Sequence, residues 1–218
     1  SICIERSLSR LRPIATLSGP IAEPDGAVVV GSVSTQDASA GYTSPPGIGN
    51  AAGSVSVAQT AQAQQINEKS LRVQAFDLQA GERAEGYVRL PSGSRNLLAY
   101  REVRVWARGA PGSEGWNDSR LQAYVKVGSD AYNFYLYRAP AHTVDWDPEM
   151  VIDLQVWQDL RQQIEDERLH GVAPNGASTC GGDPTAYVAC DGPYLVQIRD
   201  PLINPPNLAA VQELAAGI

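Results

Sequence analysis

The chain has 218 residues, with 17 Lys and Arg against 24 Asp and Glu and a formal net charge of −7. This acidic balance argues against binding nucleic acid or an anionic membrane surface, because both need clustered basic side chains. Hydrophobic residues make up 43% of the chain, which is enough for a core at this length. No apolar stretch approaches the roughly 20 residues of a membrane-spanning helix. The sequence starts at Ser1 without Met, and we interpret it as a piece of a larger protein.

The first 65 residues predict little regular structure. Residues 1–30 are broken by prolines and contain one strand-like run, at 27–30. Residues 31–65 are mostly Ser, Ala, Gly, Gln and Pro, a composition that cannot bury enough apolar surface to order itself. We expect a linker there, or an extended segment docked through its few larger residues, such as Tyr42, Ile48 and Val55. The compact domain is expected at 66–218.

Period-two alternation between Gly, Pro, Asn and Asp breaks predicts a series of short strands in this domain. The predicted strands are 71–75, 87–90, 101–108, 121–127, 132–137, 150–154, 187–189, 194–199 and 211–218. One amphipathic helix is expected at about 156–169, where Trp157, Leu160 and Ile164 recur at helical spacing and Gly171 follows as a helix stop. The prediction is therefore a mainly β fold: an antiparallel β-sandwich, jelly-roll-like, with one helix.

Alternation along two strands predicts which side chains face the core. In 101–108 the valines and Ala107 share the inner face, and in 121–127 Leu121, Ala123, Val125 and Val127 do the same. The opposite faces, with the aromatic strand at 132–137, predict a candidate binding surface. Its residues are Arg104, Trp106, Tyr124, Lys126, Tyr135 and Tyr137. Sugar rings can stack on such aromatic residues, but core packing and strand pairing are the favoured explanation of the same residues.

Two cysteines bracket a turn-rich sequence, residues 181–185. This context predicts a disulfide between Cys180 and Cys190 that closes a local hairpin. Two buried thiols are the alternative, and a zinc site is disfavoured because neither cysteine has a second ligand at metal spacing. Cys3 is left over, either free or paired outside this segment. A disulfide favours an exported compartment.

No catalytic motif is visible in the sequence. It lacks a Gly-x-Ser-x-Gly elbow, a phosphate loop, a dinucleotide fingerprint and a His-Glu-x-x-His pair. His142 and His170 are expected to be ordinary surface residues. The acidic run at 145–149 could offer oxygens to calcium but lacks a full ligand loop, and a turn in which Trp146 covers the sandwich explains it as well. We expect no enzyme activity, no cofactor and no metal.

Several blocks of the sequence resemble the SprA/Sov family, the gliding-motility and type IX secretion translocon. Residues 67–71 (Asn-Glu-Lys-Ser-Leu) and 77–82 (Asp-Leu-Gln-Ala-Gly-Glu) resemble its Asn-Glu-Gln-Ser-Leu and Leu-x-x-Gly-Asp block. Residues 100–107 and 123–137, with Gly-Ser-Asp and Asn-Phe-Tyr-Leu-Tyr, follow in the family's order. The resemblance spans 67–218. It departs at Leu136 and Arg138, where the family prefers acidic residues, and at Asp200, where it prefers Gly or Asn.

This resemblance implies an extramembrane sandwich domain inserted in a very large outer-membrane β-barrel that exports folded cargo. The chain would then be a non-catalytic structural and interaction module in the cell envelope, on the periplasmic or extracellular face. Its partners would be translocon or cell-surface subunits and the rest of the parent chain. The alternative is a carbohydrate-binding jelly roll of a secreted protein, which would expose Trp106, Tyr135 or Tyr137 on a concave face.

Overall fold

The computed structural model describes residues 2–4, 27–34, 42–46, 69–76, 82–90, 93–109, 121–141, 146, 149–176 and 180–218. The elements in chain order are β1 (Ile2–Ile4), β2 (Ala27–Ser34), β3 (Lys69–Phe76), β4 (Glu85–Arg89), β5 (Glu102–Val105), β6 (Ala107–Gly109), β7 (Gln122–Gly128), β8 (Phe134–Pro140), β9 (Met150–Asp153), α1 (Leu154–Leu169), β10 (Tyr187–Asp191), β11 (Tyr194–Ile198) and β12 (Glu213–Gly217). None of these described elements is a helix long and apolar enough to cross a membrane.

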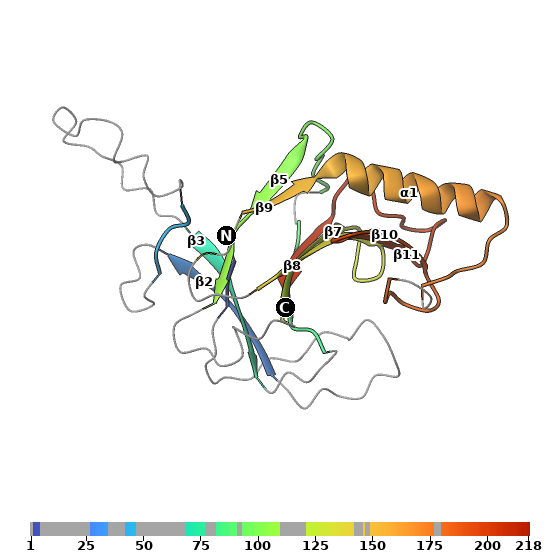
Figure 1. The fold of residues 1–218 in the computed structure, drawn as a ribbon. Helices are drawn as coiled ribbons and strands as arrows, with labels where there is room; N and C mark the ends of the chain where they lie inside the picture. Colours follow the sequence, from blue (N-terminus) through green and yellow to red (C-terminus); the bar gives the residue numbers. More distant parts are fainter. Residues whose placement is uncertain are drawn as a thin grey trace.

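The largest sheet has six strands in the order β10-β11-β8-β7-β12-β4, and every neighbouring pair is antiparallel. Helix α1 lies across one face of this sheet (Figure 1). Its apolar stripe of Trp157, Leu160 and Ile164 packs on side chains of the inner strands, as the sequence pattern predicted. Asp153 caps the helix by accepting a hydrogen bond from the Gln155 amide, and Gly171 follows the helix with a φ of 77°.

The other face of this sheet carries a second apolar cluster. Its members are Tyr124, Phe134, Leu136, Cys180, Ala186, Val188 and Leu195. The turn residues before β10 contribute Cys180 and Ala186, so this part of the chain covers the face opposite the helix. The sheet is therefore buried on both faces over much of its area, and the mainly β, sandwich-like prediction with one helix is confirmed.

The predicted Cys180–Cys190 disulfide is present. It does not join two paired strands, as the hairpin expectation had it. Cys190 lies in β10, whereas Cys180 lies in the turn-rich segment before that strand, and the real hairpin is formed by β10 and β11 around Gly192. The bond therefore holds a covering segment against the sheet.

This disulfide makes a prediction for the chain's three cysteines. Denatured, unreduced protein should contain one thiol that reacts with a thiol reagent, or none if Cys3 is paired elsewhere. The same assay after reduction, as a control, should count all three cysteines. Three reactive thiols before reduction would contradict the bond.

A second sheet joins the N-terminal segment to the rest of the chain. Its order is β2-β3-β1-β6, with β2 antiparallel to β3, and β1 parallel to both β3 and β6. The predicted strand at 27–30 continues to Ser34, into the expected linker. The domain boundary predicted at residue 66 therefore falls between strands of one sheet. Val30 and Val73 of this sheet approach Gly86 of β4, which connects the two sheets.

Tyr42 holds residues 42–46 of the 31–65 segment against β3 and Trp146. Its hydroxyl lies 2.5 Å from Ser70 Oγ, and its ring packs edge-on against Trp146 at 6.2 Å between centroids. The Arg108 guanidinium lies against both rings. Docking through a large residue is thus confirmed at Tyr42, while Ile48 and Val55 lie outside the described residues.

The strand predicted at 101–108 is in fact two strands, which is a correction. Residues 102–105 pair with β9, whereas 107–109 pair with β1, and Trp106 is the break between them. Val103 and Val105 still pack against the main core, as predicted. One run of alternating residues thus serves two sheets, because the chain turns at Trp106 and changes its pairing partner.

The turn between β7 and β8 is tied by Asp130. Its carboxylate accepts hydrogen bonds from the backbone amides of Tyr132 and Asn133 and from the side-chain amides of Asn133 and Asn204. Burial alone would raise the pKa of Asp130, but these hydrogen bonds together outweigh it and lower that pKa below its ordinary value. This turn displaces Tyr132 from the predicted strand, and β8 begins at Phe134.

Candidate functional site

The six residues predicted to form one exposed surface do not do so. Arg104 is exposed, and Trp106 and Tyr137 are half-buried. Tyr124 and Lys126 are each only 4% exposed, and Tyr135 is 1% exposed. The prediction failed because the alternation of β7 and β8 separates two faces that are both covered, one by α1 and the other by the segment before β10.

Tyr135 and Tyr137 belong to the core on the helix side of the sheet. The Tyr135 ring packs against Trp157 with 5.6 Å between centroids, and its hydroxyl donates to the Pro206 carbonyl at 2.9 Å. The Tyr137 ring packs edge-on against Tyr194 at 4.9 Å. Burial raises the pKa of both phenols. Tyr135 therefore cannot act as an open stacking platform.

Tyr124 and Lys126 meet Glu85 on the opposite face. Lys126 Nζ lies 2.6 Å from one carboxylate oxygen of Glu85, and the Tyr124 hydroxyl donates to the other at 3.1 Å. Strand β12 lies between β4 and β7, yet the side chains reach across it because β12 presents Ala215 and Gly217 there. A Cβ on Gly217 would lie 2.7 Å from the Tyr124 hydroxyl, so that crossing requires glycine.

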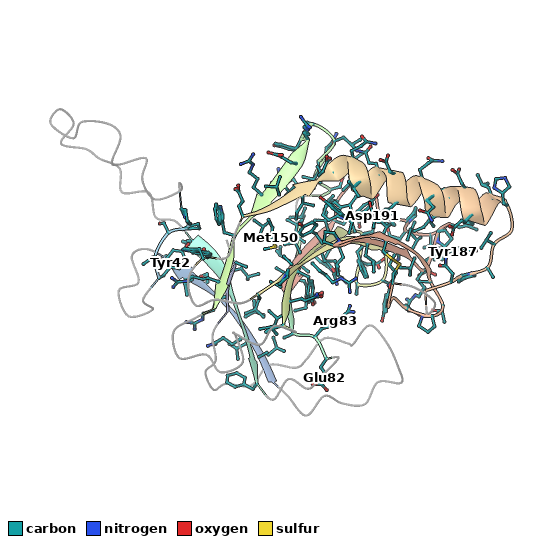
Figure 2. All side chains as sticks on the ribbon, in the orientation of Figure 1. Tyr42, Glu82, Arg83, Met150, Tyr187 and Asp191 are labelled. Atoms are coloured by element: carbon teal, nitrogen blue, oxygen red, sulfur yellow. A yellow bond between two sulfur atoms is a disulfide. The ribbon has the colours of Figure 1, made fainter. Side chains whose placement is uncertain are left out.

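Two arginines extend this group. Arg138 lies directly opposite Tyr124 in the β7–β8 ladder, and Arg83 precedes Glu85 by two residues, on the same side of β4 by strand alternation. Figure 2 labels Arg83 on the side of the main sheet away from α1. We call Arg83, Glu85, Tyr124, Lys126 and Arg138 the basic cluster. It combines three cations with a single carboxylate in a chain whose net charge is −7.

Two groups of the basic cluster have pKa values shifted by their surroundings. The pKa of Tyr124 lies well above 10, first because the phenol is buried and second because of the charge of Glu85, with Arg83 opposing the shift. The phenol therefore stays protonated at neutral pH and acts as a hydrogen-bond donor. Burial, and then the neighbouring charge of Arg83, lowers the pKa of Arg138.

Sequence reasoning found Tyr124 and Lys126 but missed Arg83, Glu85 and Arg138. A local signal exists, because Arg83, Glu85 and Arg89 are separated by even numbers of residues and so share one face of an extended segment. That signal does not identify the partner strand. Only the ladder from β4 through β12 and β7 to β8 brings the five residues of the basic cluster together.

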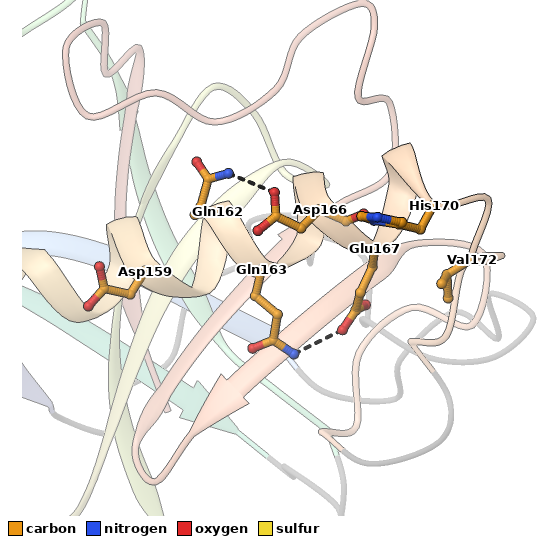
Figure 3. Close-up of a pocket in the computed structure, with 7 residues that line it drawn as sticks. All are labelled: Asp159, Gln162, Gln163, Asp166, Glu167, His170 and Val172. Atoms are coloured by element: carbon orange, nitrogen blue, oxygen red, sulfur yellow. Dashed lines mark hydrogen bonds between the residues drawn. The ribbon is translucent and has the colours of Figure 1, made fainter.

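A shallow hollow runs along the outer side of α1. It is lined by Asp159, Gln162, Gln163, Asp166, Glu167, His170 and Val172 (Figure 3). Two hydrogen bonds, each from a glutamine amide to a carboxylate one helical turn later, engage four of these side chains. Gln162 donates to Asp166 at 2.8 Å, and Gln163 donates to Glu167 at 2.9 Å. It therefore has the character of a solvated helix face.

In the acidic run at 145–149, which could offer oxygens to calcium, the two residues that the structure describes make other contacts. Glu149 pairs with Arg104 at 3.1 Å, and Trp146 packs on Tyr42. Asp145, Asp147 and His142 lie outside the described residues. His170 ends α1, with its ring nitrogen 2.7 Å from the Asp166 carbonyl. Within the described ranges, no group of three or more His, Cys, Asp or Glu side chains could hold a metal ion.

These observations define the class: a disulfide-containing, mainly β module whose main sheet carries a partly buried basic cluster. No protein-family model matches the chain, and no curated protein or solved structure matches it either.

Proposed function

We propose that this chain is a non-catalytic interaction module of a SprA-like outer-membrane translocation or cell-surface assembly, and that it binds an extended segment of a protein partner along β4. The observation that carries the binding mode is the open edge of the main sheet, where β4 is the terminal strand. An edge strand offers unpaired backbone groups to which another strand can add.

The backbone of β4 is paired with β12 on one side, and on its other side the described residues provide no paired strand. Ala84 and Ile218 exchange both of their backbone hydrogen bonds, and the Leu90 amide donates to the Gln212 carbonyl. Because bonded and non-bonded pairs alternate in an antiparallel ladder, Glu85, Tyr87 and Arg89 direct their N–H and C=O groups away from β12. Within the described residues, no strand pairs with that side.

The side chains at this edge are apolar and accessible. Tyr87 is 47% exposed and Val88 is 51% exposed, and Leu214 of β12 lies beside Val88 with 36% exposure. An added strand would cover Val88 on one face of the sheet and Tyr87 on the other. Apolar side chains at alternate positions of the partner would provide specificity while its backbone provides hydrogen bonds.

The assembly and the location rest on separate support. The blocks in 67–218 that resemble the SprA/Sov family favour a translocon-associated module in the cell envelope. The Cys180–Cys190 disulfide is typical of proteins that mature outside the cytosol. The carbohydrate-binding alternative is weakened, because it needs exposed aromatic rings and Tyr135 is buried under α1.

Cross-linking in the native assembly tests this proposal. A photo-reactive amino acid at Val88, in the full-length protein in its own cell, should cross-link to one extended segment of a partner that mass spectrometry maps. Tyr87→Pro should abolish this cross-link, because it removes an outward N–H without removing a hydrogen bond to β12. Tyr87→Ala, which keeps the N–H, should retain much of it.

The matched control places the same photo-reactive residue at Leu169, which is 72% exposed at the end of α1. Cross-linking at Val88 that is no stronger than at Leu169 would sink the strand-binding proposal. So would a cross-link that persists unchanged in Tyr87→Pro, provided that this variant melts within a few degrees of the parent.

A further inference from the structure

We propose that the basic cluster binds a phosphate or sulfate group between Arg83 and Arg138. This inference is independent of strand binding at β4, because it rests on the side chains of the face that carries Glu85, Tyr124 and Lys126. It assigns a ligand class to a site that has a charge imbalance but no assigned role.

The imbalance follows from the ion pairs. Glu85 already accepts hydrogen bonds from Lys126 and Tyr124, so its two oxygens are engaged. Among the described residues, no acid lies within ion-pair distance of Arg83 or Arg138. Lys126 is balanced by Glu85, whereas Arg83 and Arg138 have no carboxylate partner within the part of the chain that the structure describes.

The position of these guanidinium groups makes the imbalance costly. Arg138 is half-buried, and the charge of Arg83 is near enough to lower its pKa. Two like charges in a partly desolvated place repel each other more strongly than they would in water. An anion between them would remove that repulsion.

The chemistry of the two groups selects the anion. A guanidinium presents a flat fork of N–H donors that fits two oxygens of a carboxylate, phosphate or sulfate. A tetrahedral dianion can accept from two forks at once and balances both charges, whereas one carboxylate would leave a positive charge uncompensated. Two guanidinium groups therefore favour a phosphate or sulfate, either as the free ion or as a group on a larger molecule.

Titration of the full chain with inorganic phosphate tests this site, with the arginine Nε–Hε signals followed by NMR at constant ionic strength. Saturable shifts are expected for Arg83 and Arg138. Arg83→Gln and Arg138→Gln should each weaken binding by about tenfold or more, because each loses a charge-assisted pair of hydrogen bonds. Arg101→Gln is the matched control, because Arg101 is exposed and its side chain has no acidic partner among the described residues.

Further titrations distinguish a free phosphate ion from a phosphate group on a larger molecule, and both from non-specific binding of anions. Glycerol 3-phosphate that binds at least as tightly as inorganic phosphate would assign the site to a group on a larger molecule, and weaker binding would assign it to the free ion. Without phosphate, both Gln variants should melt at or above the parent temperature, since one of two repelling charges is gone. No saturable shift in the parent, equal affinity in all variants, or equal binding of acetate would overturn the proposal.

Discussion

Replacing Lys126 by Ala is expected to lower the free energy of unfolding by about 3 to 5 kcal/mol, the range for breaking one side of a buried ion pair. Lys126 is 4% exposed and its partner Glu85 is 9% exposed, with 2.6 Å between Nζ and the carboxylate oxygen. Without Lys126 the Glu85 carboxylate would keep the Tyr124 hydrogen bond but lose its countercharge in a desolvated place. Urea unfolding of the parent and the variant measures the difference.

Two further variants show whether the cost comes from the stranded charge. Arg104→Ala breaks exposed ion pairs to Glu102 and Glu149 and should cost less than about 1 kcal/mol. The double variant Lys126→Met with Glu85→Gln should recover much of the lost stability, because no unpaired charge remains. A loss for Lys126→Ala as small as that for Arg104→Ala would show that Lys126 is not buried as described.

Replacing Trp157 by Ala is expected to cost about 3 to 5 kcal/mol, the range for truncating a large aromatic core residue. Trp157 is 0% exposed and belongs to the core between α1 and the main sheet. Its ring packs against Tyr135, and its indole N–H donates to the Leu136 carbonyl at 3.1 Å. The substitution therefore leaves a cavity and removes this hydrogen bond, and thermal and urea unfolding both report the loss.

A second position on α1 provides the comparison. Leu169 is 72% exposed, so Leu169→Ala should change the free energy of unfolding by no more than about 0.5 kcal/mol. Trp157→Phe should fall between the two, since it keeps most of the ring volume but loses the hydrogen bond. Equal effects for Trp157→Ala and Leu169→Ala would contradict the packing of α1 on the sheet.

Helix α1 and most strands could be predicted from the sequence because their signals are local. Trp157, Leu160 and Ile164 repeat at the helical period, and the expected helix start at 156 differs from the observed start by only two residues. The disulfide was predictable for a similar reason, since Cys180 and Cys190 are only ten positions apart. What it holds together was not predictable, because that depends on which segment covers which face.

The candidate site shows where local signals stop. Alternation correctly placed Tyr124 and Lys126 on one face of β7 and Val127 on the other. It could not show that both faces are covered, because covering residues come from distant parts of the chain. The strand break at Trp106 could not be predicted for the same reason, since the residues on either side of it pair with strands of different sheets.

The sequence by itself determined the fold class of this protein and most of its secondary-structure elements: a mainly β chain with one amphipathic helix, a disulfide and an acidic net charge. Those features follow from composition and from interactions between residues close in the chain. Only the tertiary structure decided that β1 and β2 join β3 and β6 in one sheet, and that Glu85 meets Lys126 across β12. The physical reason is that strand pairing is non-local: any strand with an apolar face can pair with many others, and the pairing is chosen by the packing of the whole chain.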